Sequence, residues 1–220
     1  MTPVTISAIV AVRNAVESVR RALESITTQS HAIDEIVIID GRSTDGTLEV
    51  LASYPDVMVI TQPDDGLAAA RNLGLAATSG SIVAFLDADD WWEPDKTARQ
   101  VGLLIDASVH VVAGMMRRAR QGAVGANAIE TVPALTPGGL LIRRHVFDHV
   151  GDFDPRFQIA SDTEWLIRVR EAGLGPTVHS DVVLHKGVRP ESLSRDVRRY
   201  REELLQVARE RARRFDGARP

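Results

Sequence analysis

A short apolar stretch that runs directly into three aspartates constrains this 220-residue chain more than any other feature. The five residues 82–86 are too few for an independent helix, and their apolar character predicts a buried strand. Asp87, Asp89 and Asp90 follow this strand at once. Carboxylates this close repel one another, and a divalent cation that bridges to a diphosphate would neutralise them. A solvated acidic turn is the alternative that these residues leave open.

The length and composition suit one α/β domain better than two. A hydrophobic fraction of 44% is enough for a sizeable core. The sequence contains no run of 18 apolar residues, so it predicts no membrane span. The first residues lack a basic region and predict a strand, not a signal peptide. The absence of cysteine excludes disulfides and thiolate sites and fits a cytoplasmic location. A net charge of −4 argues against general nucleic-acid binding.

Strand-like segments alternate with segments of helical periodicity, which favours a mostly parallel sheet with helices on both faces. The predicted strands are 4–12, 35–40, 57–62, 82–86, 109–113, 140–142 and 177–185. A first helix is predicted after Asn14, which would be its N-cap, with Glu17 completing a capping box. The other predicted helices are 48–54, 67–77, 94–105, 144–150, 162–172 and 195–215. The segment 117–137 is rich in small residues and predicts a flexible loop or lid with one short strand.

Polar side chains follow three of these strands. Arg13 and Asn14 follow the first, Asp40 ends the second, and the aspartates at 87 and 89 follow the fourth. Ligands of a parallel sheet gather at the carboxyl ends of its strands, so the three clusters predict one site. Asp40 taken alone fits a turn-forming residue equally well. Arg71 lies among small residues in a predicted helix, where it fits either a diphosphate contact or a solvated surface.

Five blocks make the pattern specific: ISAIVAVRN, EIVIIDGRSTDGT, AAARNLGLAATSG, FLDADDWWEPDK and SDTEWLIRVREAG. In their order and spacing, over about residues 4–190, the chain resembles the family 2 glycosyltransferases. The resemblance implies a single-domain α/β GT-A fold with a Rossmann-like sheet. It implies a glycosyltransferase domain over 1–190, with a nucleotide-binding half at about 1–92 and an acceptor half at about 93–190. Residues 191–220 would form a C-terminal helical extension.

The same resemblance implies inverting transfer of one sugar from a nucleotide-diphosphate sugar, most simply UDP-linked, assisted by Mn²⁺ or Mg²⁺. Asp162 matches the catalytic base. Asp89 matches the metal-binding aspartate, and His185 is a second candidate ligand. The positions that match nucleotide-binding residues are Ala11, Val12, Arg13, Asn14, Asp40, Arg71, Asp87 and Ala88. The candidates for contact with the sugar or the acceptor are Asp90, Trp91 and Trp165.

The chain departs from the family pattern at several positions. Ala11 and Arg13 stand where proline and tyrosine are usual, and Gly41 replaces a common second aspartate. Ser161 replaces the glutamate of the usual Glu-Asp pair, so the base is kept and its partner is lost. A Q-x-x-R-W motif and membrane helices are lacking, so a processive polymerase is not expected.

Two other functions stay open. A nucleotidyltransferase would use a related sheet, but it requires a glycine-rich basic loop after the first strand, and AVRNAVES has no glycine. A non-catalytic module that only binds nucleotide sugars is compatible with the serine at 161. The acceptor, whether glycan, lipid, peptide or small molecule, is not predicted.

The C-terminal segment 195–220 carries nine arginines against five acidic residues. This charge is compatible with peripheral contact to an anionic membrane surface or an acidic partner, without a transmembrane segment, and with a cytoplasmic, membrane-associated enzyme. Its apolar residues fall on one helical face, which favours packing against the core instead: Val197, Tyr200, Leu204 and Val207.

Overall fold

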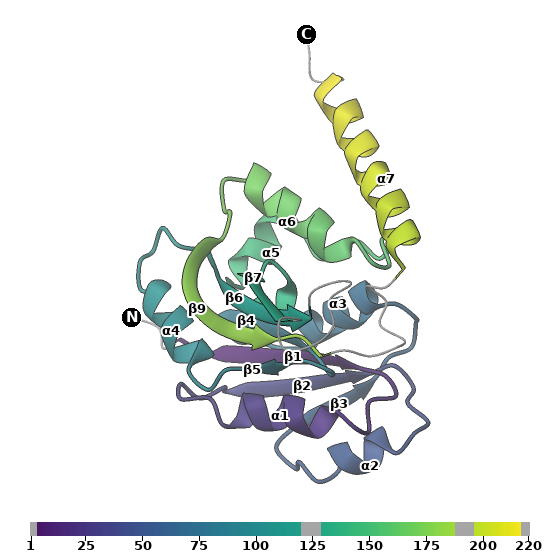
Figure 1. The fold of residues 1–220 in the computed structure, drawn as a ribbon, viewed down its shortest axis with the longest axis vertical. Coiled ribbons are helices and arrows are strands. Elements are labelled where there is room, and N and C mark those ends of the chain that lie inside the picture. The colour runs from purple at the N-terminus through teal and green to yellow at the C-terminus, as the bar shows by residue number, and fades with distance from the viewer. Residues whose placement is uncertain (1–3, 120–128, 188–195, 217–220) are drawn as a thin grey trace.

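Nine strands form one sheet in the computed structural model, which describes residues 4–119, 129–187 and 196–216 (Figure 1). The strand order is β3-β2-β1-β4-β8-β6-β9-β5, with β7 beside β6. The strands are β1 (Ile6–Val12), β2 (Glu35–Asp40), β3 (Met58–Thr61), β4 (Ile82–Asp87), β5 (Trp91–Trp92), β6 (Val111–Ala119), β7 (Ile129–Pro133), β8 (Leu140–Arg143) and β9 (Thr177–His185).

The predicted mostly parallel sheet is confirmed. β1 lies between β2 and β4 and is parallel to both, and β3 is parallel to β2. β8 runs antiparallel to both β4 and β6, whereas β9 is parallel to β6. The short strands β5 and β7 are antiparallel to their neighbours. The four parallel strands therefore send their carboxyl ends to one edge of the sheet.

Helices cover both faces, as predicted. The helices are α1 (Val19–Thr27), α2 (Thr47–Leu51), α3 (Leu67–Ala77), α4 (Lys96–Leu103), α5 (His145–Val150), α6 (Ser161–Glu171) and α7 (Val197–Asp216), with a 3₁₀ turn at Pro137–Gly139. Alternate residues of β1 point to opposite sides. Val10 packs in one cluster with Leu23 of α1, and Ile9 packs in the other with Val169 of α6. Two apolar layers, each removed from water, hold the sheet between its helices.

Two predicted helix starts are wrong. Asn14 does not cap the first helix, which begins five residues later, at Val19. Its backbone has a left-handed φ of 49°, and its side chain accepts a hydrogen bond from Thr44 N at 2.9 Å. Asn14 therefore ties the loop after β1 to the loop after β2. The fourth helix begins at Lys96 and not at Pro94, because Trp91–Trp92 forms a short strand before it.

The second half differs from prediction mainly in its strands. The strand expected at 109–113 begins at Val111 and continues to Ala119, and it pairs with β7. Residues 117–119 and 129–133 of the segment 117–137 therefore belong to antiparallel strands. Residues 120–128 of the expected lid lie outside the described part of the chain.

Lys96, at the start of α4, is completely buried. Its ammonium donates to Oε1 of Gln100 at 2.7 Å and to the carbonyl of Leu140 at 3.0 Å. It also lies 4.6 Å from the ring centroid of Trp92. No carboxylate pairs with it within the described residues. Burial lowers the pKa of Lys96 to about 7, because the charged form loses water and gains no counter-ion.

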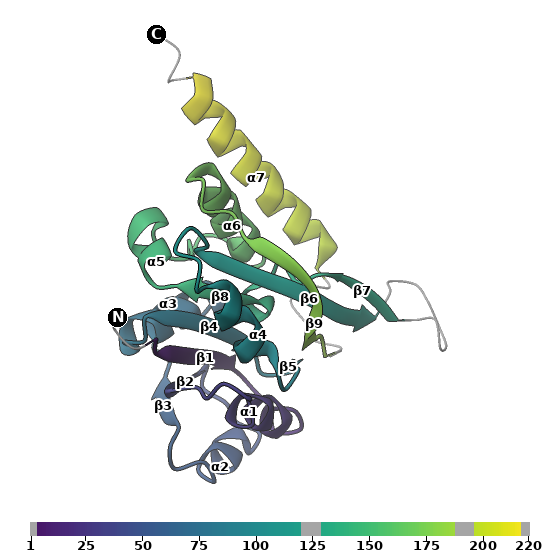
Figure 2. The ribbon, with the colours of Figure 1, turned by 90° about the vertical axis from the view of Figure 1, so that its left-hand side faces the viewer.

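α7 runs beside α6 and continues past it, as Figures 1 and 2 show. Val207 of α7 is 3% exposed, which agrees with the expectation that the apolar face packs against the body. Val197, at the start of the helix, stays exposed. In the parts of the chain that the structure describes, no helix has the length and apolar character needed to cross a bilayer.

Candidate active site at the carboxyl edge of the sheet

The register of the parallel strands brings the predicted clusters together. Ala11 of β1 lies opposite Asp87 of β4, and Val12 lies opposite Asp40 of β2. The loop residues that follow each strand therefore begin at the same level of the sheet. The sequence prediction that these positions share one edge is confirmed by this register.

Asp87 lies between two cations. Oδ1 of Asp87 accepts a hydrogen bond from Nη2 of Arg71 at 2.9 Å, and Oδ2 lies 3.2 Å from Nζ of Lys186. Arg71 reaches it from α3, where its side chain is 5% exposed, and its guanidinium also lies over the ring of Phe153 at 5.6 Å. Lys186 reaches it from the residue after β9. Three elements distant in sequence thus meet at one carboxylate.

Asp90 fixes the chain that follows β9. Its Oδ2 lies 2.6 Å from Nζ of Lys186, and its Oδ1 accepts a hydrogen bond from the backbone N–H of Gly187 at 2.9 Å. A Cβ atom at Gly187 would lie 1.9 Å from the carbonyl oxygen of Asp89, so only glycine fits there. Asp90 is 1% exposed. It holds two backbone segments together, so the predicted contact with sugar or acceptor is not supported for this residue.

The charges of this cluster perturb one another. Burial alone would raise the pKa of Asp87, but the facing charges of Lys186 and Arg71 lower it well below the usual range. Burial raises the pKa of Asp90, and the neighbouring Asp87 adds to that shift. Burial would lower the pKa of Lys186, yet Asp87 and Asp90 together raise it. At neutral pH the cluster therefore holds Lys186 as a cation facing an ionised Asp87.

Asp162 is the second residue of α6 and belongs to the same electrostatic cluster. Burial raises its pKa, with Asp87 adding to the shift, whereas Arg71 and Lys186 oppose it. Its Oδ1 accepts a hydrogen bond from the backbone N–H of Thr163 at 2.7 Å. A carboxylate with a raised pKa, near two cations and at a helix start, is suited to accept a proton.

The loops after β1 and β2 form the other side of the edge. Asp40 is completely buried, and its carboxylate accepts a hydrogen bond from the backbone N–H of Ser43 at 3.2 Å. It therefore orders the turn after β2, and the structure offers no exposed oxygen for a nucleotide. Arg13 and Arg42 are both exposed and share Asp65, at 3.2 and 2.6 Å. Arg13 is thus a basic side chain at the rim, at the position where the family pattern usually has tyrosine.

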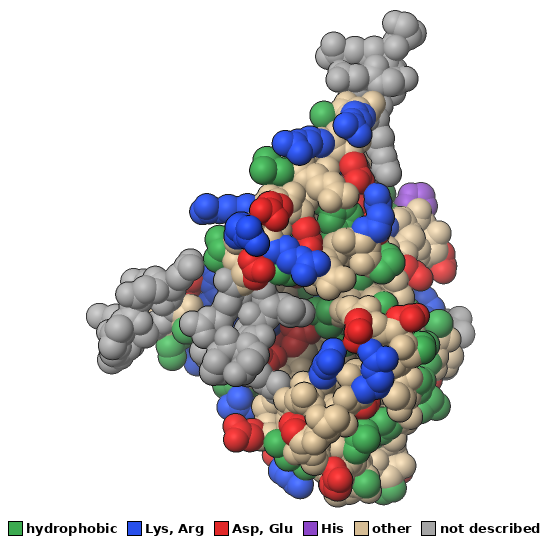
Figure 3. All heavy atoms as spheres, turned by 90° about the vertical axis from the view of Figure 1, so that its right-hand side faces the viewer, with side chains coloured by type: hydrophobic (Ala, Val, Ile, Leu, Met, Phe, Trp, Pro, Cys, Tyr) green, Lys and Arg blue, Asp and Glu red, His purple; other side chains and the backbone are tan. Residues whose placement is uncertain are grey.

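Figure 3 shows a hollow on one face of the molecule, with acidic side chains at its bottom and basic side chains at its edge. This charge pattern fits an anionic ligand that approaches together with a cation.

The donor set for a divalent cation is small. Both oxygens of Asp87 and both of Asp90 are engaged by protein donors, and Asp89 lies between these two residues in the sequence of the acidic loop. No group of three metal-ligating side chains exists among the residues that the structure describes. Mg²⁺ and Mn²⁺ are commonly held by one or two carboxylates together with substrate phosphates and water. Asp89, which the resemblance matches to the metal-binding aspartate, would accordingly hold a cation together with a diphosphate and not within a closed protein cage.

His185 is not placed as a metal ligand. Its Nε2 lies 2.6 Å from Oε1 of Glu93, and its ring stacks on Trp91 with centroids 4.9 Å apart. Trp91 in turn lies under the guanidinium of Arg21 at 3.6 Å. These contacts occupy ring surface of Trp91 that a sugar would need. The structure therefore favours a structural stack for His185 and Trp91 over the predicted ligand and sugar contacts.

Trp165 is also misassigned by the sequence prediction. It is 0% exposed, stacks on Phe147 with centroids 4.8 Å apart, and donates from Nε1 to the carbonyl of Gly151 at 3.0 Å. A ring without exposed surface cannot stack on a sugar. Ala88, by contrast, keeps its place in the acidic loop between the two aspartates of the D-x-D, with a buried side chain.

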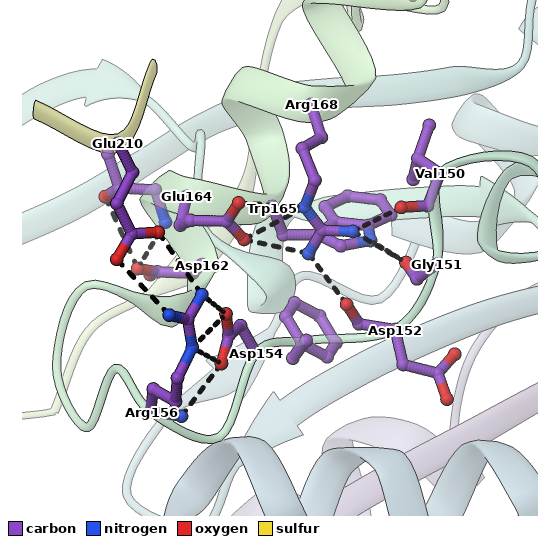
Figure 4. Close-up of polar contacts among 12 residues, drawn as sticks. Val150, Gly151, Asp152, Asp154, Arg156, Asp162, Glu164, Trp165, Arg168 and Glu210 are labelled. Carbon is purple, nitrogen blue, oxygen red and sulfur yellow. Dashed lines mark hydrogen bonds and ion pairs between the residues drawn. The ribbon is translucent and has the colours of Figure 1, made fainter. Parts of the chain in front are cut away.

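Figure 4 shows the polar contacts around α6 and the loop that precedes it. Arg168 pairs with Glu164 at 2.8 Å and donates to the backbone carbonyls of Val150 and Asp152. Arg156 pairs with Asp154 and with Glu210 of α7. Arg168 thus ties the helix that carries Asp162 to the backbone at Val150 and Asp152, and Arg156 ties the loop before that helix to α7.

Two residues of the site were missed from the sequence. Lys186 is one of only two lysines in the chain, which is a signal that arginine would not serve equally well there. Glu203 of α7 contacts the loop before α6, and no local pattern around it points to that role.

Solved structures share this fold. The chain superimposes on a Pyrobaculum calidifontis mannosyltransferase, PcManGT, solved with GDP-Man and Mn²⁺, with a TM-score of 0.74, 22% identity and coverage of 96% of this chain and 65% of that one. It superimposes on S. aureus TarS 1-349 in complex with UDP with a TM-score of 0.69, 20% identity and coverage of 91% and 65%. The fold is therefore the α/β GT-A fold.

Sequence comparison gives the family. The Escherichia coli protein WfaP, a UDP-Glc:alpha-D-GlcNAc-diphosphoundecaprenol beta-1,3-glucosyltransferase, is 33% identical over 99 residues, which cover 44% of this chain and 39% of WfaP. The chain spans less than half of the length of the first curated relatives it matches. The family model "Glycosyl transferase family 2" matches residues 7–160, which include all but the first residue of β1, the strands β2 to β4 and the acidic loop. By this match over most of its length, the chain belongs to glycosyl transferase family 2.

Proposed function

We propose that this chain transfers one sugar from a nucleotide-diphosphate sugar to an acceptor hydroxyl, with inversion at the anomeric carbon and with help from Mn²⁺ or Mg²⁺. The observation that carries the proposal is the cluster of Arg71, Asp87 and Lys186, with Asp162 in the same electrostatic environment. It combines cations for a diphosphate with a carboxylate that is suited to take a proton. Family membership supports the same reaction class.

Each residue has a distinct part in this reaction. Asp162 accepts the proton of the acceptor hydroxyl as the hydroxyl oxygen attacks the anomeric carbon. Arg71 and Lys186 face the edge where the diphosphate leaves, and their charges stabilise its developing negative charge. A divalent cation, held by Asp89 and the diphosphate, would supply Lewis-acid stabilisation of the leaving group. Asp40 and Asn14 order the loops against which the base and ribose would lie.

We propose UDP as the nucleotide, because WfaP uses a UDP sugar and TarS was solved with UDP. The complex of PcManGT with GDP-Man makes GDP the competing choice. A location in the cytoplasm and a peripheral membrane contact through α7 stay predictions, and so does the division at residue 190.

Thermal unfolding with UDP-, GDP- and dTDP-sugars, each with and without Mn²⁺, tests the donor. A ligand that binds only the folded state raises the melting temperature. The donor with the largest rise is then used to follow transfer or slow hydrolysis as nucleotide release. An inverted anomeric configuration in the product, measured by NMR, supports the mechanism, and a retained configuration rejects it.

Asp162→Asn separates the enzyme from a binding module. The substitution keeps the shape of the side chain and removes the proton acceptor. Nucleotide release should fall about 100-fold or more, while the affinity for UDP stays within twofold. Asp152→Asn, an exposed aspartate of the loop before α6, is the matched control and should keep full activity. Wild-type turnover in Asp162→Asn would show that Asp162 is not the base. Donor binding without any turnover in the wild-type protein would instead leave only the binding-module function.

A further inference from the structure

A glutamate of the C-terminal helix holds the loop that leads into α6. Oε1 of Glu203 accepts a hydrogen bond from the backbone N–H of Gln158 at 3.1 Å. Oε2 accepts two more, from Ile159 and Ala160, both at 2.9 Å. Three consecutive amides therefore converge on one carboxylate, which is 8% exposed. Burial would raise the pKa of Glu203, but these three N–H donors and Arg199 lower it, so the carboxylate is ionised at neutral pH.

These amides precede the helix that carries Asp162. α6 begins at Ser161, and its N-cap residue Ala160 has no side chain that can accept a hydrogen bond. The backbone N–H groups at the start of a helix have no acceptor within the helix, so they need an acceptor from elsewhere. Glu203 is that acceptor, 41 positions after Asp162 in the sequence.

α7 contacts α6 at further points. The hydroxyl of Tyr200 lies 3.1 Å from Oγ1 of Thr163, the residue after Asp162. Farther along, Arg211 lies 3.8 Å from Glu164 and also pairs with Glu171. α7 thus lies along α6, and its first half contacts the turn that bears Asp162.

The same loop is fixed from the opposite side by α3. Asn72 donates from Nδ2 to the carbonyl of Phe153 at 2.7 Å and accepts from the N–H of Phe153 at 3.0 Å. Its neighbour Arg71 pairs with Asp87. The segment from Phe153 to Ala160 is therefore clamped at one end by α3 and at the other by Glu203.

We propose that Glu203 is a positioning residue for the proposed base Asp162, so that α7 is part of the catalytic unit. The inference rests on the function proposed above. A general base must lie within hydrogen-bond reach of the hydroxyl it deprotonates, so small movements of its helix turn reduce the rate of the chemical step. Nucleotide binding depends on other elements and should not change.

The variant Glu203→Gln tests this role, because an amide keeps the size of the side chain but loses the charge and one acceptor oxygen. Glu210→Gln is the matched control: it lies on the same face of α7 and loses a pair with Arg156, without contact to residues 158–160. Both variants are compared with wild type and with Asp162→Asn. The measurements are amide hydrogen exchange over residues 158–164, the dissociation constant for UDP, and the kcat and KM for nucleotide release.

For Glu203→Gln we expect exchange over 158–164 to accelerate at least tenfold and kcat to fall about tenfold, with the UDP dissociation constant and the donor KM within twofold of wild type. Glu210→Gln should leave both exchange and kcat near wild type. Unchanged exchange in Glu203→Gln, or equal losses of kcat in the two variants, would overturn the proposal. A parallel loss of UDP affinity would do the same, because it indicates general unfolding.

The test of Glu203 can fail or succeed independently of the test of the proposed base. If Asp162→Asn turns over normally, the assignment of the base fails, while the exchange experiment still decides whether Glu203 orders α6. If Glu203→Gln does not fold, Glu203→Asp and Tyr200→Phe replace it. Glu203→Asp keeps the charge and should recover at least half of the wild-type kcat. Tyr200→Phe should lower kcat two- to threefold at unchanged UDP affinity, and wild-type kcat in this variant would count against the proposal.

Discussion

The ammonium of Lys186 lies 2.6 Å from Oδ2 of Asp90, across 96 residues of sequence. Asp90 lies in the acidic loop after β4, and Lys186 follows β9. The same ammonium lies 3.2 Å from Asp87. The protein therefore supplies one cation of its own to an acidic loop whose sequence predicts a metal.

Replacing Lys186 with methionine should destabilise the protein, because the carboxylates of that loop would then repel one another without the ammonium between them. Asp87 keeps Arg71, but Asp90 loses its only cation within the described residues. We expect the free energy of unfolding to fall by about 2 kcal/mol, below the range for a fully buried pair because Lys186 is 28% exposed. Chemical denaturation measures this loss.

Mn²⁺ without nucleotide should then raise the melting temperature of Lys186→Met but not of wild type, because the metal replaces the missing ammonium. Lys96→Met, which removes the only other lysine, is the control and should show no such response. Equal responses of both variants to Mn²⁺ would contradict the idea that Lys186 occupies a cation position.

Arg71→Met should weaken nucleotide binding more than it slows turnover of bound substrate. The substitution keeps an apolar stem over Phe153 and removes the charge that faces Asp87 and the proposed diphosphate. We expect the dissociation constant for UDP, measured by calorimetry with Mn²⁺, to rise about tenfold, the effect of losing one charge-assisted contact. Arg99→Met, at an exposed pair with Asp95 and Asp181, should bind UDP as wild type does. Unchanged UDP affinity in Arg71→Met would remove Arg71 from the nucleotide site.

The pH dependence of turnover should report the raised pKa of Asp162. A base acts only when it is ionised, so activity is lost as the pH falls through the pKa of the base. Because burial raises that pKa, the acidic limb of kcat should lie at a higher pH than the value of about 3.9 for an ordinary aspartate. A kcat that stays level down to pH 4 in a folded enzyme would be inconsistent with Asp162 as the base.

The buried Lys96 should make the free energy of unfolding depend on pH above pH 7. Its pKa is about 7 in the folded state and about 10.4 in the unfolded state, so between these values the unfolded chain binds more protons. Stability therefore rises with pH, by up to about 4 kcal/mol between pH 7 and pH 10. Lys96→Met removes this rise, and the difference between the two proteins in chemical denaturation measures it. Parallel stability curves would show that Lys96 stays charged in the core.

The sequence alone determined most of the helices and strands of this protein and the parallel arrangement of its sheet. Apolar segments of strand length, alternating with helical periodicity, predicted the parallel sheet, and the predicted bounds of β2, α3 and β9 agree with the structure. These signals are local, because burial on one or two faces fixes which residues must be apolar. The clusters after β1, β2 and β4 were predictable for the same reason: parallel strands end at one edge.

The tertiary structure decided which polar residues the edge actually exposes. Asp40 and Asp90 have the residue type of ligand-binding groups, yet both are buried as acceptors for the protein's own backbone. Trp165 has the residue type of a sugar platform, but the apolar layer between α5 and α6 covers it. Lys186 and Glu203 gained their roles from segments 96 and 43 residues away, respectively. Such pairings depend on how helices and strands pack together in three dimensions, and no periodicity within a single segment records them.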